Sequence, residues 1–171
     1  MSNYLIPLMV VVPMLCAILV NAFAKFNKSI KVLTFVVAIC LPIIPLLSNY
    51  GLHFFGGYTP MLDNATGVIY HPAITYAFDM LQQIFIAAVG LITFLVAFIY
   101  LSKYKKASGQ YLFLLFMGTA SVTALMLTDD IFNMFVFFEI LALVQVGIVI
   151  ASPMDYSYEM ALKYMILGSI G

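Results

Sequence analysis

The stretch IFNMFVFFEILALVQVGIVIA, residues Ile131–Ala151, decides the fold class of this chain. It is long enough to cross the hydrocarbon core of a bilayer, which takes about 20 apolar residues of helix, and Glu139 is its only ionisable side chain. A further run opens near Tyr158 and is cut off at Gly171. Four other runs of the same kind come earlier: Leu5–Ala24, Val32–Leu47 with its flanks, Met80–Leu101 and Tyr111–Thr128. The sequence therefore predicts an all-α membrane protein with five full transmembrane helices and the start of a sixth.

The composition supports this prediction. Hydrophobic residues make up 65% of the chain and charged residues only 8%, whereas soluble domains are about 45–50% apolar and about 25% charged. Seven lysines balance seven acidic residues, and arginine is absent. A soluble globular domain and a disordered chain are thereby excluded, as is a nucleic-acid binder, which needs a basic stripe. We expect the lipid bilayer to be the main surroundings of the chain.

Lysine placement predicts the topology. One lysine group, Lys25 to Lys31, follows the first apolar run, and a second, Lys103 to Lys106, follows the third. The loop 49–79 contains no lysine. Because loops rich in Lys and Arg stay in the cytoplasm, we expect a multi-pass protein of the cell membrane with its N-terminus outside.

The outer loop 49–79 is long for a structureless connection. It contains the turn signals Gly56-Gly57 and Thr59-Pro60, and loops of about 30 residues without structure of their own are uncommon. We therefore expect a short β-hairpin here. We interpret the remaining polar residues of the loop as interfacial and assign them no function, namely His53, His71 and the triplet Asn64-Ala65-Thr66.

Glu139 is the most informative residue. It lies eight residues after Ile131, which places it roughly 12 Å below the outer surface and close to mid-bilayer. A carboxylate there costs several kcal/mol unless it is paired, hydrated or protonated, and such residues are typical of proton or ion relays. The alternative is a neutral glutamic acid that hydrogen-bonds two helices together. Since the face around Glu139 is otherwise apolar, we expect its partner on another helix.

Lys163 is the best partner that this chain offers. It lies about 10 Å in from the inner surface, whereas Glu139 is about 20 Å from that surface, so a water-linked relay is expected rather than direct contact. An equally good interpretation makes Lys163 a surface residue, because Glu159 precedes it by four residues and lysines near helix ends snorkel. The pair Asp129-Asp130 has two interpretations, a point where a cation enters and a cap of the following helix.

Two segments together resemble a known family. They are LTDDIFNMFVFFE, residues Leu127–Glu139, and ALKYMILGSIG, residues Ala161–Gly171. They are similar to the antiporter-like membrane subunits of respiratory complex I, Mrp-type cation/proton antiporters and energy-converting membrane hydrogenases. The archaeal hydrogenase version is the most similar, through residues 111–171 and through the segment Ala77–Gln83.

The resemblance implies an organisation and two site residues. Residues 1–110 would form the N-terminal helices with the outer loop, and residues 111–171 would start the proton-translocating antiporter-like domain. Glu139 would be the key acid of a proton half-channel, and Lys163 would lie along the family's charged axis. The family's seventh-helix lysine and second half-channel have no counterpart before Gly171. We therefore interpret the chain as the N-terminal fragment of a longer protein.

The function expected from this resemblance is proton or sodium translocation, as a non-catalytic subunit of a redox-driven complex such as an energy-converting hydrogenase or a complex I-like oxidoreductase. Glu139 would gain and lose a proton as the charge of a nearby lysine changes, because a positive charge favours the ionised carboxylate and desolvation favours the neutral acid.

The chain has no CxxC, haem or nucleotide-binding motif. The resemblance implies that iron–sulfur and nickel–iron centres belong to partner subunits in a peripheral redox arm, beside other membrane subunits. Two alternatives remain, an Mrp-type antiporter subunit and a purely structural subunit of the membrane arm.

Overall fold

The computed structural model describes residues 5–25, 27–49, 51–56, 74–104, 108–151 and 157–170. Five helices in this part of the chain, α1 to α5, are long and apolar enough to cross a membrane. The predicted all-α membrane fold is therefore confirmed, and each helix begins and ends within a few residues of the run that predicted it. The elements in chain order are α1 (Leu5–Ala22), α2 (Asn27–Leu47), β1 (Leu52–Gly56), β2 (Ile74–Phe78), α3 (Met80–Lys103), α4 (Gly109–Leu127), α5 (Ile131–Ile150) and α6 (Ser157–Ile170).

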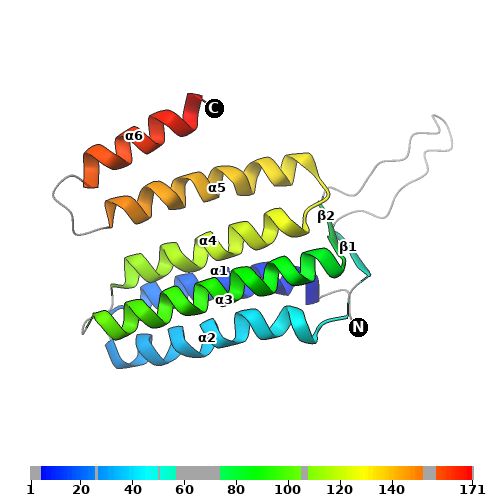
Figure 1. Ribbon diagram of the computed structural model, residues 1–171, viewed down its shortest axis with the longest axis horizontal. Helices are drawn as coiled ribbons and strands as arrows, with labels where there is room; N and C mark the ends of the chain where they lie inside the picture. Colours follow the sequence, from blue (N-terminus) through cyan, green and yellow to red (C-terminus); the bar gives the residue numbers. More distant parts are fainter. Residues whose placement is uncertain are drawn as a thin grey trace.

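The helices run up and down in a layered bundle (Figure 1). Helix α2 packs mainly against α3, and α1 packs mainly against α4. Helix α5 then packs on α4, and α6 packs on α5 at the edge of the bundle. Large apolar side chains on the outward faces are exposed, for example Leu19, Val36 and Ile99. Apolar faces of this kind suit contact with lipid tails or with further transmembrane helices.

Prolines lie inside the first two helices. Pro13 lies within α1, and Pro42 and Pro45 lie within α2, and both helices continue through them. Gly90 of α3 lies directly against α2 at Pro42, because a Cβ built on Gly90 would be 2.6 Å from the Pro42 nitrogen. The absence of a side chain at Gly90 is thus what lets α2 and α3 approach so closely.

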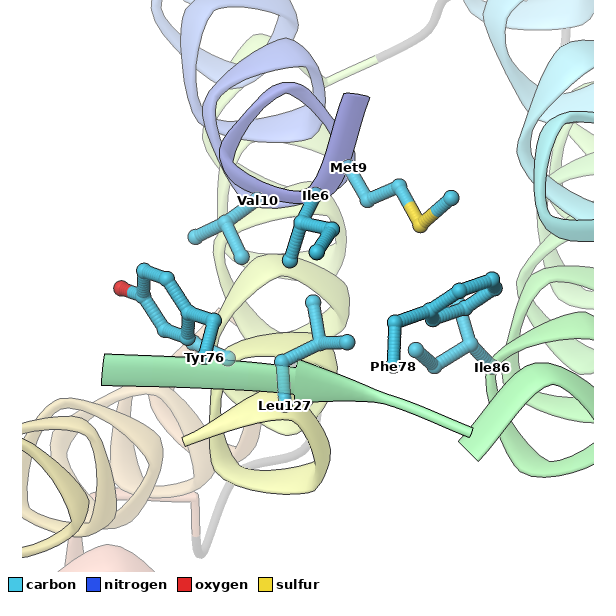
Figure 2. Close-up of a cluster of buried hydrophobic side chains, with 8 residues drawn as sticks. Ile6, Met9, Val10, Tyr76, Phe78, Ile86 and Leu127 are labelled. Atoms are coloured by element: carbon cyan, nitrogen blue, oxygen red, sulfur yellow. The ribbon is translucent and has the colours of Figure 1, made fainter. Parts of the chain in front are cut away.

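A β-hairpin closes one end of the bundle and confirms the hairpin predicted in the loop 49–79. Strands β1 and β2 pair in antiparallel fashion, from Leu52 opposite Phe78 to Gly56 opposite Ile74. Side chains of β2 lie under the bundle end, in a cluster of buried apolar residues with α1, α3 and α4 (Figure 2). The cluster, here called the hairpin cluster, comprises Ile6, Met9, Val10, Tyr76, Phe78, Ile86, Ala124 and Leu127.

The described lysines of the two predicted cytoplasmic loops lie at the bundle end opposite the hairpin. Lys31 Nζ donates a hydrogen bond to the Tyr104 carbonyl oxygen at 3.2 Å, which links the start of α2 to the end of α3. Both loops therefore share one end of the bundle, as the predicted alternation requires. The placement of the N-terminus on the outer side of the membrane stays a prediction. Several sequence predictions fall outside the described residues or on side chains that are not described: Lys28, His53, the triplet at 64–66, His71, Lys105 and Lys106.

Candidate functional site

Glu139 lies near the middle of α5 and points away from α4. Helix α5 has 20 residues, and Glu139 lies roughly 12 Å along it at 1.5 Å per residue. The side of α5 that packs on α4 carries the buried residues Asn133 and Val144. It also carries Gly147, where an added Cβ would lie 2.9 Å from Leu114 Cδ2. At 3.6 residues per turn, the position of Glu139 is rotated about the helix axis by roughly 80–140° from these three positions, so it lies on a different side of α5.

The carboxylate of Glu139 lies on the stripe of α5 that faces α6. Val146 and Ile150 follow it by seven and eleven residues, which places all three on one side of the helix. Val146 and Ile150 line an apolar groove whose opposite wall is α6, with Ala161 and Met165. Glu139 is exposed, and it has no hydrogen-bond or ion-pair partner among the residues that the structure describes. The partner expected on another helix therefore stays a prediction.

Lys163 does not contact Glu139. Its Nζ donates to Glu159 Oε1 at 2.7 Å, one turn earlier on α6. The two side chains are 61% and 60% exposed, so this is a surface ion pair of the acid-first i,i+4 type. The structure thus shows the surface pair that was one of the two interpretations of Lys163, and the relay role stays a prediction.

Asp130 caps α5. Its Oδ2 accepts a hydrogen bond from the Asn133 backbone nitrogen at 3.1 Å, which satisfies one of the free N–H groups of the first turn. Asp129 is exposed beside it. Asp130 therefore has the capping role that was one of the two interpretations of the acidic pair. A role of Asp129 and Asp130 in cation uptake stays a prediction.

Sequence reasoning missed a polar connection between the hairpin and α5. Asn133 Nδ2 donates to Thr128 Oγ1 at 3.0 Å and to the Tyr76 hydroxyl at 3.3 Å. Tyr76 also forms an isolated antiparallel bridge with Thr128. The only signal in the sequence was the position of Asn133, three residues after the cap Asp130. Nothing in the spacing pointed to Tyr76, which is 57 residues away.

The fold and these side chains define a class, a multi-pass α-helical membrane protein with a carboxylate at mid-depth of its fifth helix. In the part of the chain that the structure describes, no group of three His, Cys, Asp or Glu side chains could hold a metal ion.

Comparison with known proteins connects this class to the antiporter-like subunits. No family model matches the chain. It is 37% identical over 168 residues to an uncharacterized protein of Methanocaldococcus jannaschii, an alignment that covers 98% of this chain and 33% of that protein. It is 22% identical over 165 residues to a Na(+)/H(+) antiporter subunit of Alkalihalophilus pseudofirmus, covering 96% of this chain and 33% of that protein.

Among solved structures, a similar chain belongs to the membrane-bound sulfane sulfur reductase, an archaeal respiratory membrane complex. The TM-score is 0.78 at 22% sequence identity, over 96% of this chain and 34% of the other. The two chains therefore share a fold, and the predicted resemblance to antiporter-like membrane subunits is confirmed. The greater similarity to the hydrogenase version stays a prediction. This chain spans about a third of the length of each of these three proteins.

Proposed function

We propose that this chain is the N-terminal part of a membrane subunit that translocates protons or sodium ions within a redox-driven complex, and that Glu139 is its proton-binding group. The subunit itself performs no redox chemistry. Partner subunits hold the iron–sulfur or nickel–iron centres in a peripheral arm, and other membrane subunits flank it. The hydrogenase-type and complex I-type versions of such a complex both fit the proposal.

One observation supports the proposal above the others. Glu139 is an ionisable side chain in the middle of a membrane-length helix, and it has no partner among the described residues. A carboxylate at that depth is costly unless it is used or paired. The similarity to an antiporter subunit and to a respiratory membrane complex supports the same assignment.

Lys163 is the second residue to which the proposal gives a role. In the structure the Lys163 ammonium forms an ion pair with Glu159. Water and salt screen an exposed pair of this kind, so it can open at little cost. Once free, the Lys163 charge can act on Glu139 through water and favour release of its proton, because a nearby positive charge favours the ionised carboxylate.

The test replaces Glu139 in the full-length protein, in membranes that contain its complex. Glu139→Gln keeps the shape and most of the hydrogen-bonding capacity but cannot titrate. We expect the pH gradient and the sodium uptake driven by the electron donor to be lost in membrane vesicles, while assembly of the complex and electron transfer persist. Omitting sodium, and adding a protonophore, distinguishes the two ions.

Two variants serve as matched controls. Asp79→Asn removes a carboxylate from the same chain at the N-cap of α3, where asparagine also caps a helix, and should leave transport near the wild-type level. Glu139→Asp keeps a titrating group and should retain part of the transport. Full coupled transport by Glu139→Gln would instead support the structural alternative, in which the residue only hydrogen-bonds to a neighbouring helix.

A second candidate function is an Mrp-type cation/proton antiporter subunit, which the similarity to a Na(+)/H(+) antiporter favours. Such a protein exchanges sodium for protons without an electron donor. Sodium-driven proton movement in vesicles that lack any donor would therefore favour the antiporter. Strict dependence on a donor would favour the redox-driven complex.

A further inference from the structure

A small cavity lies among α1, α2, α3 and α4, next to the hairpin cluster. Met9 and Ile86 belong to both, and Figure 2 shows them on the α1 and α3 sides of that cluster. The cavity wall includes Pro13 of α1 and Pro45 of α2, and Thr119 and Thr123 of α4. It is thus lined by α1, α2, α3 and α4 and lies apart from Glu139 and α6.

Two of the residues that line the cavity have carbonyl groups without their helical N–H donors. In an α-helix the carbonyl of residue i accepts from the N–H of residue i+4, and proline has no N–H. Pro13 therefore leaves the Met9 carbonyl without its donor, and Pro45 does the same for Leu41. Met9, Pro13, Leu41 and Pro45 all line the cavity. In a membrane such carbonyls are satisfied by neighbouring side chains or by ordered water.

The cavity wall also carries an unpaired hydroxyl. Thr123 is only 3% exposed, and its hydroxyl has no hydrogen-bond partner among the described residues. Thr119, one turn earlier, differs because its hydroxyl donates to the Leu115 carbonyl oxygen at 2.9 Å and lies 2.9 Å from Thr93 Oγ1. Thr123 is therefore the donor on this wall that remains available to a bound molecule.

The size of the cavity fits one water molecule. Its volume is about 10 Å³, close to the roughly 10–15 Å³ needed for a single water. Buried waters typically make about three hydrogen bonds. A water at this position can donate to the Met9 and Leu41 carbonyl oxygens and accept from the Thr123 hydroxyl, which makes three.

We propose that a structural water molecule occupies this cavity and joins α1, α2 and α4 through the Met9 and Leu41 carbonyls and the Thr123 hydroxyl. It satisfies the two carbonyls that the prolines leave without donors. A sodium ion is the competing occupant, because carbonyl and hydroxyl oxygens also bind cations. Water is favoured because the cavity wall carries no acidic side chain to balance a charge.

The test is X-ray hydroxyl-radical footprinting of the full-length protein in membranes, with mass spectrometry of the methionines. Radicals formed from a bound water oxidise a methionine beside it, even a buried one. Met9 is only 5% exposed. Met117 packs, partly buried, against a second cluster of buried apolar residues that includes Leu112 and Phe116 of α4. It does not line the cavity and serves as the internal control. We expect Met9 to be oxidised several-fold more than Met117.

Two variants and one change of buffer complete the test. Thr123→Val has the same shape but no hydroxyl, and should lower Met9 oxidation to the Met117 level. Thr123→Ser keeps the hydroxyl and should preserve it. Met9 oxidation no higher than that of Met117 in the wild type would overturn the proposal, as would unchanged Met9 oxidation in Thr123→Val. Met9 oxidation that depends on sodium, compared with choline buffer, would overturn it in favour of an ion. The wild-type comparison of the two methionines stands even where a variant fails to fold.

Discussion

Replacement of Gly90 by alanine should weaken the contact between α2 and α3. The new Cβ would lie 2.6 Å from the Pro42 nitrogen and 2.8 Å from the Leu41 carbonyl carbon. Ordinary van der Waals contact begins at 3.4 Å, so the helices must separate by about 0.8 Å, the difference between 3.4 and 2.6. Both neighbours are backbone atoms and cannot rotate away. Overpacking of this kind costs about 1–3 kcal/mol, offset by up to about 1 kcal/mol of helix propensity.

Gly118→Ala is the matched control for this prediction. Its added Cβ would meet the terminal Val144 Cγ1 at 3.2 Å, a side-chain methyl group that can shift by a few tenths of an ångström. Both substitutions gain the same helix propensity, so the difference in their free energy of unfolding isolates the packing cost at Gly90. We expect Gly90→Ala to be less stable than Gly118→Ala by about 1–3 kcal/mol, measured by reversible unfolding of the full-length protein in mixed micelles. Equal stability of the two variants would refute the reasoning.

Three further predictions concern the ends of the bundle. With the native cysteines removed, Lys103→Cys should resist an impermeant thiol label added from outside, while a cysteine in the hairpin should react, because lysine-rich loops stay in the cytoplasm. Labelling of Lys103→Cys from outside would show that the topology is the reverse of the predicted one. Tyr76→Phe removes one of the two acceptors of the Asn133 amide and should lower the free energy of unfolding by about 0.5–2 kcal/mol, a typical value for one buried hydrogen bond. An unchanged unfolding midpoint would make that bond dispensable. Lys163→Ala should slow ion transport without loss of assembly if the ammonium leaves Glu159 to act in the relay, whereas wild-type transport rates would restrict Lys163 to its surface pair.

The helices could be predicted because each one is a continuous apolar run with polar residues at its ends. The hairpin could be predicted as well, since Gly56-Gly57 and the length of the loop indicated it. The surface pair of Lys163 with Glu159 followed from their spacing of four residues. These features all depend on residues that are close together in the sequence, for which spacing and composition carry enough information.

The features that could not be predicted depend on which helices are neighbours. The bond between Tyr76 and Asn133 joins residues 57 positions apart, and no periodicity links them. The fit of Gly90 against Pro42 depends on the pairing of α2 with α3. The surroundings of Glu139 depend on the side of α5 to which it points, which is fixed by the packing of Asn133 on α4 and the hairpin.

The connection between Tyr76, Thr128 and Asn133 also constrains the order of biosynthesis. Asn133 belongs to the first turn of α5, so the ribosome has already delivered four membrane-length segments before this amide appears. Until then the Tyr76 hydroxyl and the Thr128 side chain lack their shared donor. The hairpin end of the bundle can therefore be completed only when the fifth segment enters the membrane. A translation intermediate stalled before Asn133 should expose this end to proteases that the finished bundle resists.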